Sequence, residues 1–352
     1  MSTPRQSSSI RKVGIIGEGK MGSGILYFLS GFNFEIVWVC SAEADLEKLL
    51  RQFEKRIKRT TEGGAGNMSH QDLLLRTIIT KDPRTLYNCD LIIEAIPEVL
   101  AMKQELFLLL DTFVQPGCIF TSNSSSIKPS DLVKAGSTRP FAGLHFFYPV
   151  SLKNMVEFTP GPNTSPAVHQ EIESFLHTIG RSFITLDEKN SFILNKIFLE
   201  FQNEAFRIVQ DDECTFSQMD RLVKKNFFPF GVFDFCDSVG LDTMANSVRN
   251  YSRDYPDRER FERFLAFLDK LVAAGKLGVK TREGFYQYPV TEAPGPDPAH
   301  ASEIEEYLRQ TWFETCKKFA VQSSLSPNQV IHAIEEYFGI ELSPLERLLF
   351  ED

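Results

Sequence analysis

Short apolar runs alternate with helical patterns in the first half of the chain. The runs, many of them rich in β-branched residues, lie at 12–17, 35–40, 77–80, 90–95, 118–122, 141–147, 154–159 and 182–186. Between them, apolar residues recur at helical spacing. Because this alternation is typical of a parallel sheet covered by helices, the pattern predicts an α/β domain from Lys12 to about Asp187.

The pattern changes after about Phe192. The stretch FILNKIFLEFQNEAFRIV (192–209) has its apolar residues at helical spacing, and strand signals almost vanish beyond it. The predicted fold class is therefore α/β, with an N-terminal domain built on a mostly parallel sheet, followed by an all-α C-terminal domain.

The helical part contains a weak internal repeat. Residues 198–223 and 309–334 align at an offset of 111 residues, which matches Thr215 to Ser326 as helix caps and Met219 to Val330. Shortly afterwards GVFDF (231–235) aligns with SPLER (343–347) at an offset of 112. A degenerate duplication is predicted, and two unrelated amphipathic helical pairs are the alternative. The predicted divisions are 1–11, a disordered N-terminus; 12–190, the sheet domain; 191–290, a helical domain for substrate binding or dimerisation; 291–302, a linker rich in Pro and Ala; and 303–352, the second helical copy.

A glycine-rich turn follows the first predicted strand. KVGIIGEGKMGSGILYFL places Gly17, Gly19 and Gly22 between a strand and a helix. Glycines allow the tight turn and the close approach of a pyrophosphate, which then lies on the N–H groups at the positive end of the helix. The turn predicts a Rossmann-type dinucleotide-binding domain.

The second strand departs from the usual fingerprint. An acidic residue is expected at its end, where it would bind the ribose hydroxyls of the adenosine. VWVCSAEAD instead places Cys40 there, followed by Ser41. Loss of the carboxylate weakens discrimination against a 2′-phosphate, but no arginine stands at 41–44 to attract one. NAD is the predicted cofactor, with NADP as the alternative.

Composition excludes several function classes. A formal net charge of -9 disfavours nucleic acid and anionic membranes as partners, because both are polyanionic. The six cysteines and six histidines show no metal-ligand spacing, so no metal site is expected. No apolar run approaches a membrane span, and the N-terminus lacks the apolar core of a signal peptide. These features predict a cytoplasmic protein.

Four polar features follow in chain order, namely SNSSS (122–126), His145, Glu157 and Asn195. Each alone has an ordinary structural explanation: a helix cap for the serines, a satisfied core group for the histidine, and another cap for the asparagine. Together with a nucleotide-binding turn they suggest alcohol oxidation. That reaction needs a base for the hydroxyl proton while the cofactor accepts the hydride.

These residues also carry a family resemblance. The chain resembles the 3-hydroxyacyl-CoA dehydrogenase family, in particular its 3-hydroxybutyryl-CoA dehydrogenases, over nearly its whole length from Lys12. The matching stretches are GEGKMGSGI (17–25), IIEAIPEVLAMKQELF (92–107), SNSSS (122–126), RPFAGLHFFYPVSLKNMVEF (139–158), FPFGVFDFCDSVGLD (228–242) and GKLGVKTREGFYQY (275–288).

The resemblance implies roles for matching positions. Ser125 corresponds to the catalytic serine near the substrate hydroxyl or carbonyl, and His145 to the general base. Glu157 corresponds to the carboxylate that orients the base, and Asn195 to a group that binds substrate. A turn between two strands would bring His145 and Glu157 together. Cofactor contacts are expected at Gly17, Gly19, Lys20, Met21, Gly22, Cys40, Ser41, Ala95, Ile96, Glu98, Lys103, Asn123 and Tyr148. For Lys103, a solvated helix position is the alternative.

Three departures fall around the implied pocket. Tyr148 replaces the asparagine usual after HFF, NSF (190–192) replaces PGF, and Lys196 replaces an arginine. They leave the four catalytic positions intact. They put the acyl group in doubt and suggest a bulky, branched or carrier-tethered one.

Family substrates carry coenzyme A or a related arm, so an acidic protein needs a local basic patch. KLLRQFEKRIKR (48–59) supplies six cations, and Lys48 and Lys55 are predicted to bind substrate. A solvated basic face is the alternative.

The predicted function is NAD(P)-dependent interconversion of 3-hydroxyacyl and 3-oxoacyl thioesters of coenzyme A or a carrier protein. The alternatives are oxidation of a free hydroxy acid of the sugar-acid type and a non-catalytic nucleotide-binding or structural homologue. A second helical copy would take the place of a partner subunit, so a monomer or weak homodimer is expected.

Overall fold

The chain forms two compact units, residues 1–191 and 192–352. The computed structural model describes residues 8–62, 70–134, 136–290, 296–323, 325–343 and 346–347. Parts of the predicted N-terminus (1–7), of the linker (291–295) and of the second helical copy (324, 344–345 and 348–352) lie outside the described residues.

The first unit is built on an eight-stranded sheet with the order β3-β2-β1-β4-β5-β6-β7-β8. Neighbouring strands in it run parallel, except that β6 and β7 are antiparallel. All eight runs predicted as strands form strands. Their bounds are β1 Lys12–Ile16, β2 Glu35–Val39, β3 Thr77–Thr80, β4 Leu91–Glu94, β5 Ile119–Ser122, β6 Phe141–Phe146, β7 Met155–Pro160 and β8 Ser182–Thr185.

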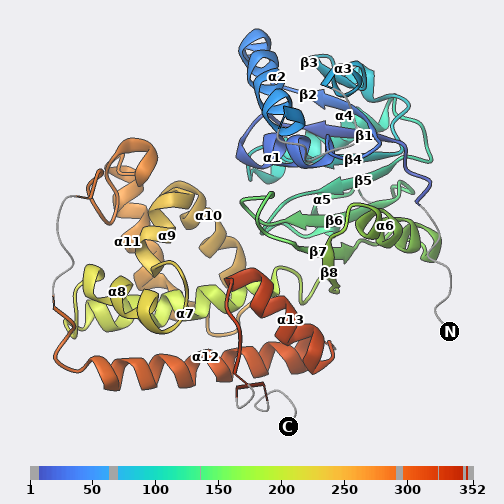
Figure 1. Cartoon of the computed structure of the whole chain (residues 1–352). Coiled ribbons are helices and arrows are strands. Elements are labelled where there is room, and N and C mark those ends of the chain that lie inside the picture. The colour runs from blue at the N-terminus through green and yellow to red at the C-terminus, as the bar shows by residue number, and fades with distance from the viewer. Residues whose placement is uncertain are drawn as a thin grey trace. The chain divides into compact units, whose positions relative to one another are not determined.

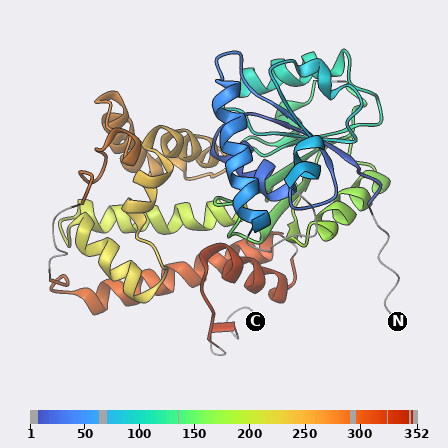
Figure 2. The same ribbon diagram turned by 45° about the horizontal axis from the view of Figure 1, so that its top comes forward.

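Helices cover both faces of this sheet (Figures 1 and 2). One apolar cluster joins the sheet to α1, α2 and α6, and a second joins the opposite face to α4, α5 and the short helix η1. Successive strand residues point to opposite faces, which places Ile15 in the first cluster and Ile16 in the second. The bounds are α1 Lys20–Leu29, α2 Leu46–Glu62, α3 His70–Leu75, η1 Pro83–Leu86, α4 Leu100–Asp111, α5 Pro129–Leu132 and α6 Pro166–Thr178.

Residues 8–11 differ from their prediction as part of a disordered N-terminus. The Ser8 hydroxyl donates a hydrogen bond of 2.6 Å to Glu171 on α6, and the Ser9 N–H donates one of 2.7 Å to the same oxygen. Ile10 is 1% exposed and belongs to the first apolar cluster. The Glu171 carboxylate therefore fixes the chain before β1 by accepting hydrogen bonds from Ser8 and Ser9.

The described part of the second unit is almost entirely helical, with isolated bridges at Gly278, Glu283 and Gln287 as its strand-like pairing. The predicted class, a mostly parallel sheet domain followed by an α-helical domain, is confirmed. The bounds are α7 Ile193–Gln210, α8 Phe216–Asn226, α9 Val232–Val239, α10 Leu241–Ser252, η2 Arg258–Phe261, α11 Glu262–Ala273, η3 Val279–Thr281, α12 Ala301–Ser323 and α13 Pro327–Phe338. None of the described helices combines the length and apolarity that crossing a bilayer requires.

The C-terminal helices pack through aromatic rings on α7 and on the loop that follows α8. Trp312 of α12 lies with its ring centroid 5.9 Å from that of Phe201 and 5.0 Å from that of Phe228. Phe338 of α13 packs on both Trp312 and Phe228. Edge-to-face aromatic pairs stabilise beyond the area that they bury, so α12 and α13 form one core with the helices before the linker.

The structure also bears on the proposed repeat. Thr215 at the start of α8 and Ser326 at the start of α13 both form a capping box with the glutamine three residues later. Met219 and Val330, the next matched pair, are both buried. These features support a duplication, which remains a prediction.

Two buried aspartates explain the motif at 275–288. Asp237 accepts hydrogen bonds from the N–H groups of Phe285 and Tyr286 and from the Tyr288 hydroxyl. A Cβ at Gly284 would lie 2.0 Å from the Asp237 carboxylate, so only glycine fits there. Asp220 of α8 accepts from the Tyr286 hydroxyl at 2.8 Å and from two N–H groups at the start of α9.

Asp220 should make stability depend on pH. Burial raises the pKa of its carboxyl to about 6, above the 3.8 expected when unfolded. The folded state therefore binds more protons between these values. The stabilisation by protonated Asp220 is complete below about pH 4 and is lost as pH rises through 6, an effect on the order of 3 kcal/mol. We expect the gap in unfolding free energy between the parent and Asp220→Asn to shrink from pH 4 to pH 7 in urea titrations. A gap that is constant with pH would contradict this.

Candidate active site

His145 and Glu157 face each other across the antiparallel pair β6 and β7. The two residues are direct partners in the strand register, and His145 Nδ1 lies 2.9 Å from Glu157 Oε2. Both are buried, at 6% and 1% exposure. A carboxylate at Nδ1 favours the tautomer that carries its proton there, which leaves the Nε2 lone pair able to accept a proton.

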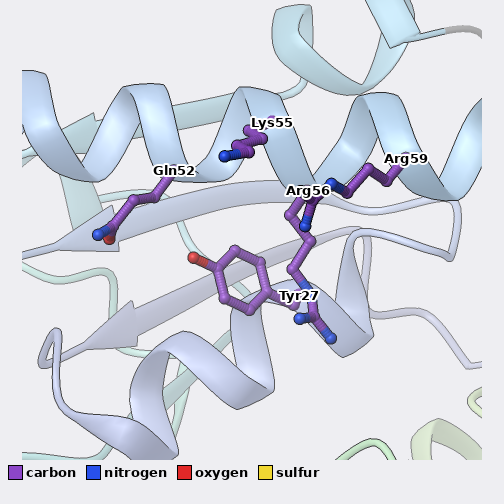
Figure 3. A pocket seen from close by; sticks show the side chains of 5 residues that line it. All are labelled: Tyr27, Gln52, Lys55, Arg56 and Arg59. Carbon is purple, nitrogen blue, oxygen red and sulfur yellow. The ribbon is translucent and has the colours of Figure 1, made fainter.

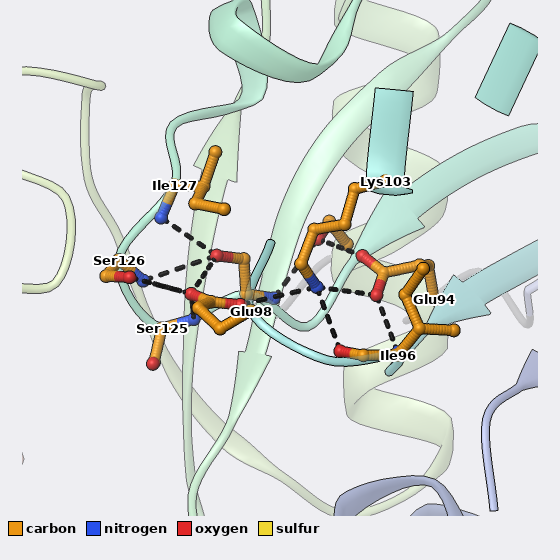
Figure 4. Close-up of polar contacts among 9 residues, drawn as sticks. Glu94, Ile96, Glu98, Lys103, Ser125, Ser126 and Ile127 are labelled. Atoms are coloured by element: carbon orange, nitrogen blue, oxygen red, sulfur yellow. Dashed lines mark hydrogen bonds and ion pairs between the residues drawn. The ribbon is translucent and has the colours of Figure 1, made fainter. Parts of the chain in front are cut away.

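The serine loop after β5 is organised by Glu98. One oxygen of the Glu98 carboxylate accepts hydrogen bonds from the N–H groups of Ser125 and Ser126 and from the Ser124 hydroxyl. The Ser125 hydroxyl points away from Glu98 (Figure 4). Burial opposes ionisation of Glu98, but Lys103 and the serine hydroxyls outweigh it and lower its pKa. An ionised carboxylate thus fixes the backbone of the predicted catalytic serine.

Lys103 is buried rather than solvated. Its side chain is 1% exposed, and Nζ lies 2.6 Å from Glu94 Oε1 and 3.3 Å from Glu98 Oε2 (Figure 4). The alternative of a solvated helix position is therefore wrong. Glu94, at the end of β4, also accepts a hydrogen bond of 2.5 Å from the Ser122 hydroxyl, so these charges join the ends of β4 and β5 to α4. Glu94 was not among the predicted site residues, although a glutamate that ends the apolar run LIIE (91–94) was a signal for it.

The glycine turn fits a pyrophosphate. Gly17 has a φ of +112°, and a Cβ there would lie 2.5 Å from the Ala95 carbonyl oxygen. A Cβ at Gly22 would lie 2.0 Å from the Gly17 oxygen, so α1 starts tightly against β1. At Gly19, by contrast, a Cβ would meet nothing within 4 Å. That open space at the N-terminal end of α1 is where a dinucleotide phosphate binds in such folds.

The other predicted cofactor residues differ in accessibility. Tyr148 is 57% exposed, and the Lys20 ammonium lies 5.8 Å from its ring centroid. Met21 and Ala95 pack on one apolar cluster and Ile96 on the other. Asn123 uses its side-chain oxygen to accept from the Phe146 N–H at 2.8 Å, which ties β5 to the end of β6 beside His145.

Cys40 does not offer its thiol to a cofactor. It is 4% exposed within the first apolar cluster, and burial raises the pKa of its thiol to about 12. Ser41 next to it is exposed and donates two hydrogen bonds to Glu18. Burial of the Cys40 side chain therefore argues against the cofactor contact predicted there.

Asn195 belongs to the helical unit, at the start of α7. Its Nδ2 donates to the Tyr251 hydroxyl at 2.8 Å, and its Oδ1 accepts from the Tyr337 hydroxyl at 2.7 Å. The amide is thus held from both ends. Neither tyrosine was among the predicted site residues, and Tyr337 lies 142 residues from Asn195 in sequence.

The basic segment forms one wall of a hollow on the sheet unit. The hollow has a volume of about 430 Å³ and is lined by Tyr27 of α1 and by four residues of α2, namely Gln52, Lys55, Arg56 and Arg59 (Figure 3). The Arg56 guanidinium lies 4.9 Å from the Tyr27 ring centroid. Lys55, predicted to bind substrate, lines this hollow, whereas Lys48 does not.

The sheet-unit features share one edge. The glycine turn, Ser41, Glu98, the serine loop and His145 all lie at or just after the carboxyl ends of parallel strands, where open α/β sheets bind their ligands. A Rossmann-type sheet with a phosphate-binding turn and a buried histidine–carboxylate pair defines a dinucleotide-dependent dehydrogenase. Residues 12–189 match the family model described as "3-hydroxyacyl-CoA dehydrogenase, NAD binding domain", and residues 192–288 match "3-hydroxyacyl-CoA dehydrogenase, C-terminal domain". The chain belongs to the 3-hydroxyacyl-CoA dehydrogenase family, as its sequence predicted, and NAD is its cofactor.

Relatives agree with this membership. The mouse mitochondrial hydroxyacyl-coenzyme A dehydrogenase is 32% identical over 288 residues, which are 79% of this chain and 91% of that protein. A probable 3-hydroxybutyryl-CoA dehydrogenase of Deinococcus radiodurans is 31% identical over 280 residues, covering 79% and 100%. The solved (S)-3-hydroxybutyryl-CoA dehydrogenase PaaH1 from Ralstonia eutropha is 29% identical, with a TM-score of 0.70 over 80% of this chain and 100% of that one.

Helices α12 and α13 lie beyond both matched domains. The dehydrogenase part of multifunctional enzyme 1 from Caenorhabditis elegans covers 98% of this chain and 78% of that one, with 22% identity and a TM-score of 0.50. At this identity the match shows the fold alone. Because the match covers 98% of this chain, the similarity of fold includes α12 and α13, which follow the linker.

Replacement of Lys103 should cost stability. Lys103→Met leaves two carboxylates without their buried cation, and loss of one partner of a buried ion pair costs about 3–5 kcal/mol. We expect that loss in urea unfolding, with partial recovery in the double variant Lys103→Met, Glu94→Gln. If Lys103→Met kept its unfolding free energy and only weakened NADH binding, Lys103 would line the cofactor rather than support the loop.

Proposed function

We propose that this protein interconverts 3-hydroxyacyl and 3-oxoacyl thioesters with NAD, using His145 as the general base. The buried pair of His145 and Glu157 is the observation that carries the proposal. The pair lies at the strand edge that also carries the phosphate-binding turn, and family membership supports the reaction class.

The proposed chemistry divides the work between cofactor and chain. NAD, when bound, supplies the hydride acceptor. In oxidation, His145 Nε2 takes the proton from the substrate 3-hydroxyl as the hydride leaves the carbon that bears this hydroxyl. In reduction, His145 returns the proton to the oxygen on that carbon. Glu157 stabilises the imidazolium formed in between. The Ser125 hydroxyl is proposed to hydrogen-bond the reacting oxygen, and Asn195 is proposed to bind substrate.

Coenzyme A is the proposed carrier. The mouse and Deinococcus relatives are named for coenzyme A substrates, and the hollow on α2 offers Lys55, Arg56 and Arg59 to an anionic arm. A carrier protein is the alternative. A free dicarbonyl compound is a second candidate, because a solved diketoreductase described as acting on dicarbonyl compounds is 29% identical, with a TM-score of 0.62 over 79% of this chain and 99% of that one.

Two properties stay predictions. A monomer or weak homodimer is expected, because α12 and α13 form the predicted second helical copy and would take the place of a partner subunit. A cytoplasmic location is expected from the sequence, although the mouse relative is named as mitochondrial.

Loss of the base should slow turnover strongly. We expect His145→Gln to lower kcat for reduction of acetoacetyl-CoA by about 10²–10⁴-fold, because a positioned acid or base contributes that much. Glu157→Gln should lower kcat by a smaller factor, because the imidazole remains and loses only its carboxylate partner. The matched control is His177→Gln, an exposed histidine on α6. Reaction is followed by nicotinamide absorbance, in parallel with the carrier-protein thioester and a free diketone.

Full activity of His145→Gln would contradict the assignment of the base. No NADH oxidation by the parent protein with either thioester would contradict the function itself. Turnover of the diketone alone would favour the second candidate.

The basic hollow should affect KM selectively. Lys55→Glu and Arg59→Glu are each expected to raise KM for acetoacetyl-CoA about fivefold or more at low salt, with little change in kcat, because the reversed charge repels the phosphates of coenzyme A. Arg51→Glu is the control, since Arg51 pairs with Glu47 on the same helix and does not line the hollow. A thioester of N-acetylcysteamine, which lacks phosphates, should show no change. An equal rise with that substrate would rule the hollow out as a phosphate site.

A further inference from the structure

The end of β2 lacks the carboxylate that usually binds the adenosine ribose. β2 ends at Val39, and the side chain of Cys40, which follows it, is buried in the apolar core. The cofactor is nevertheless NAD, which this fold usually distinguishes from NADP by a carboxylate at this point. Another acidic group near Ser41 could do the same work.

Glu18 brings a carboxylate to that point from the glycine turn. It stands between Gly17 and Gly19, and its Oε2 accepts from the Ser41 N–H at 3.0 Å while its Oε1 accepts from the Ser41 hydroxyl at 2.5 Å. Partial burial favours the neutral form, but the hydrogen bonds from Ser41 and the charge of Lys81 outweigh it and lower the pKa of Glu18. The group is therefore an anion at neutral pH, fixed at the carboxyl end of β2.

The position of this anion suits a ribose. Each carboxylate oxygen can accept a second hydrogen bond, and Glu18 is only partly buried. The same turn would hold the pyrophosphate at Gly19, one residue further on. We propose that Glu18 is the specificity-determining residue for the adenosine half of the cofactor: it accepts hydrogen bonds from the ribose hydroxyls and repels a 2′-phosphate, so that NADH binds more tightly than NADPH.

Three other charged side chains lie close to Glu18 or Ser41 in sequence or in space. Asp45 accepts from the Lys48 N–H at the start of α2, so its carboxylate is used as a helix cap. Lys81 donates to the Ala42 carbonyl at 2.6 Å and would by itself favour a 2′-phosphate. Glu43 is exposed, two residues after Ser41. Of these four charged groups, Glu18 is the one that accepts hydrogen bonds from Ser41. Glu43 carries the same charge nearby and therefore serves as the matched control.

The test measures binding and needs no acyl substrate, so it is independent of the proposed thioester reaction. Dissociation constants of NADH and NADPH are measured by nicotinamide fluorescence on the full chain. The unmodified protein should bind NADH at least about tenfold more tightly than NADPH, since a fixed charge this close to a phosphate is worth that factor or more. Glu18→Gln should lower this preference about tenfold, and Glu18→Lys should lower it further. Glu43→Gln should leave it unchanged.

Three results would overturn the proposal. The first is equal binding of both cofactors by the unmodified protein, which requires no variant to fold. The second is an equal weakening of both cofactors in Glu18→Gln, which would show a structural role for the turn. The third is a loss of preference in Glu43→Gln as large as in Glu18→Gln.

Discussion

The antiparallel pairing of β6 with β7 is the constraint on which the candidate site depends. In a sheet whose other strands run parallel, this one reversal sets Glu157 directly opposite His145. Both side chains are buried, and a buried carboxylate without a partner would be costly. The imidazole at 2.9 Å meets part of that requirement, so fold stability and the orientation of the proposed base depend on the same contact.

Carboxylates organise the loops of this acidic protein. Glu98 gathers the serine loop, Asp237 holds the hairpin that ends the family domain, and Glu171 fixes the chain before β1. Each accepts several N–H or O–H donors at once, which loops offer because their backbone lacks ladder partners. These acids therefore fix loop backbone in both units, and Glu98 among them fixes the serine loop of the candidate site.

The sequence predicted the elements of this site better than its contacts. Strand positions and the glycine turn follow from local periodicity and backbone sterics, so eight strands and the dinucleotide fold could be predicted. Lys103 could not, because its helical setting allows solvation and its burial depends on Glu94 of another strand. Glu18 occupies a variable position of the GxG turn, and only the close approach of β1 to β2 brings it to Ser41. Tyr337 meets Asn195 through packing of distant helices.

That last contact gives the C-terminal segment a role beyond covering apolar surface. Trp312 and Phe338 close an aromatic core with Phe201 and Phe228, an arrangement that fixes α13 against α7. With α13 fixed, the Tyr337 hydroxyl reaches Asn195 and donates to its Oδ1 while Nδ2 donates to Tyr251, so the amide is held between two hydroxyls. Because α13 lies outside the matched family domains, Asn195, a proposed substrate residue, is held by a side chain that those domains do not contain.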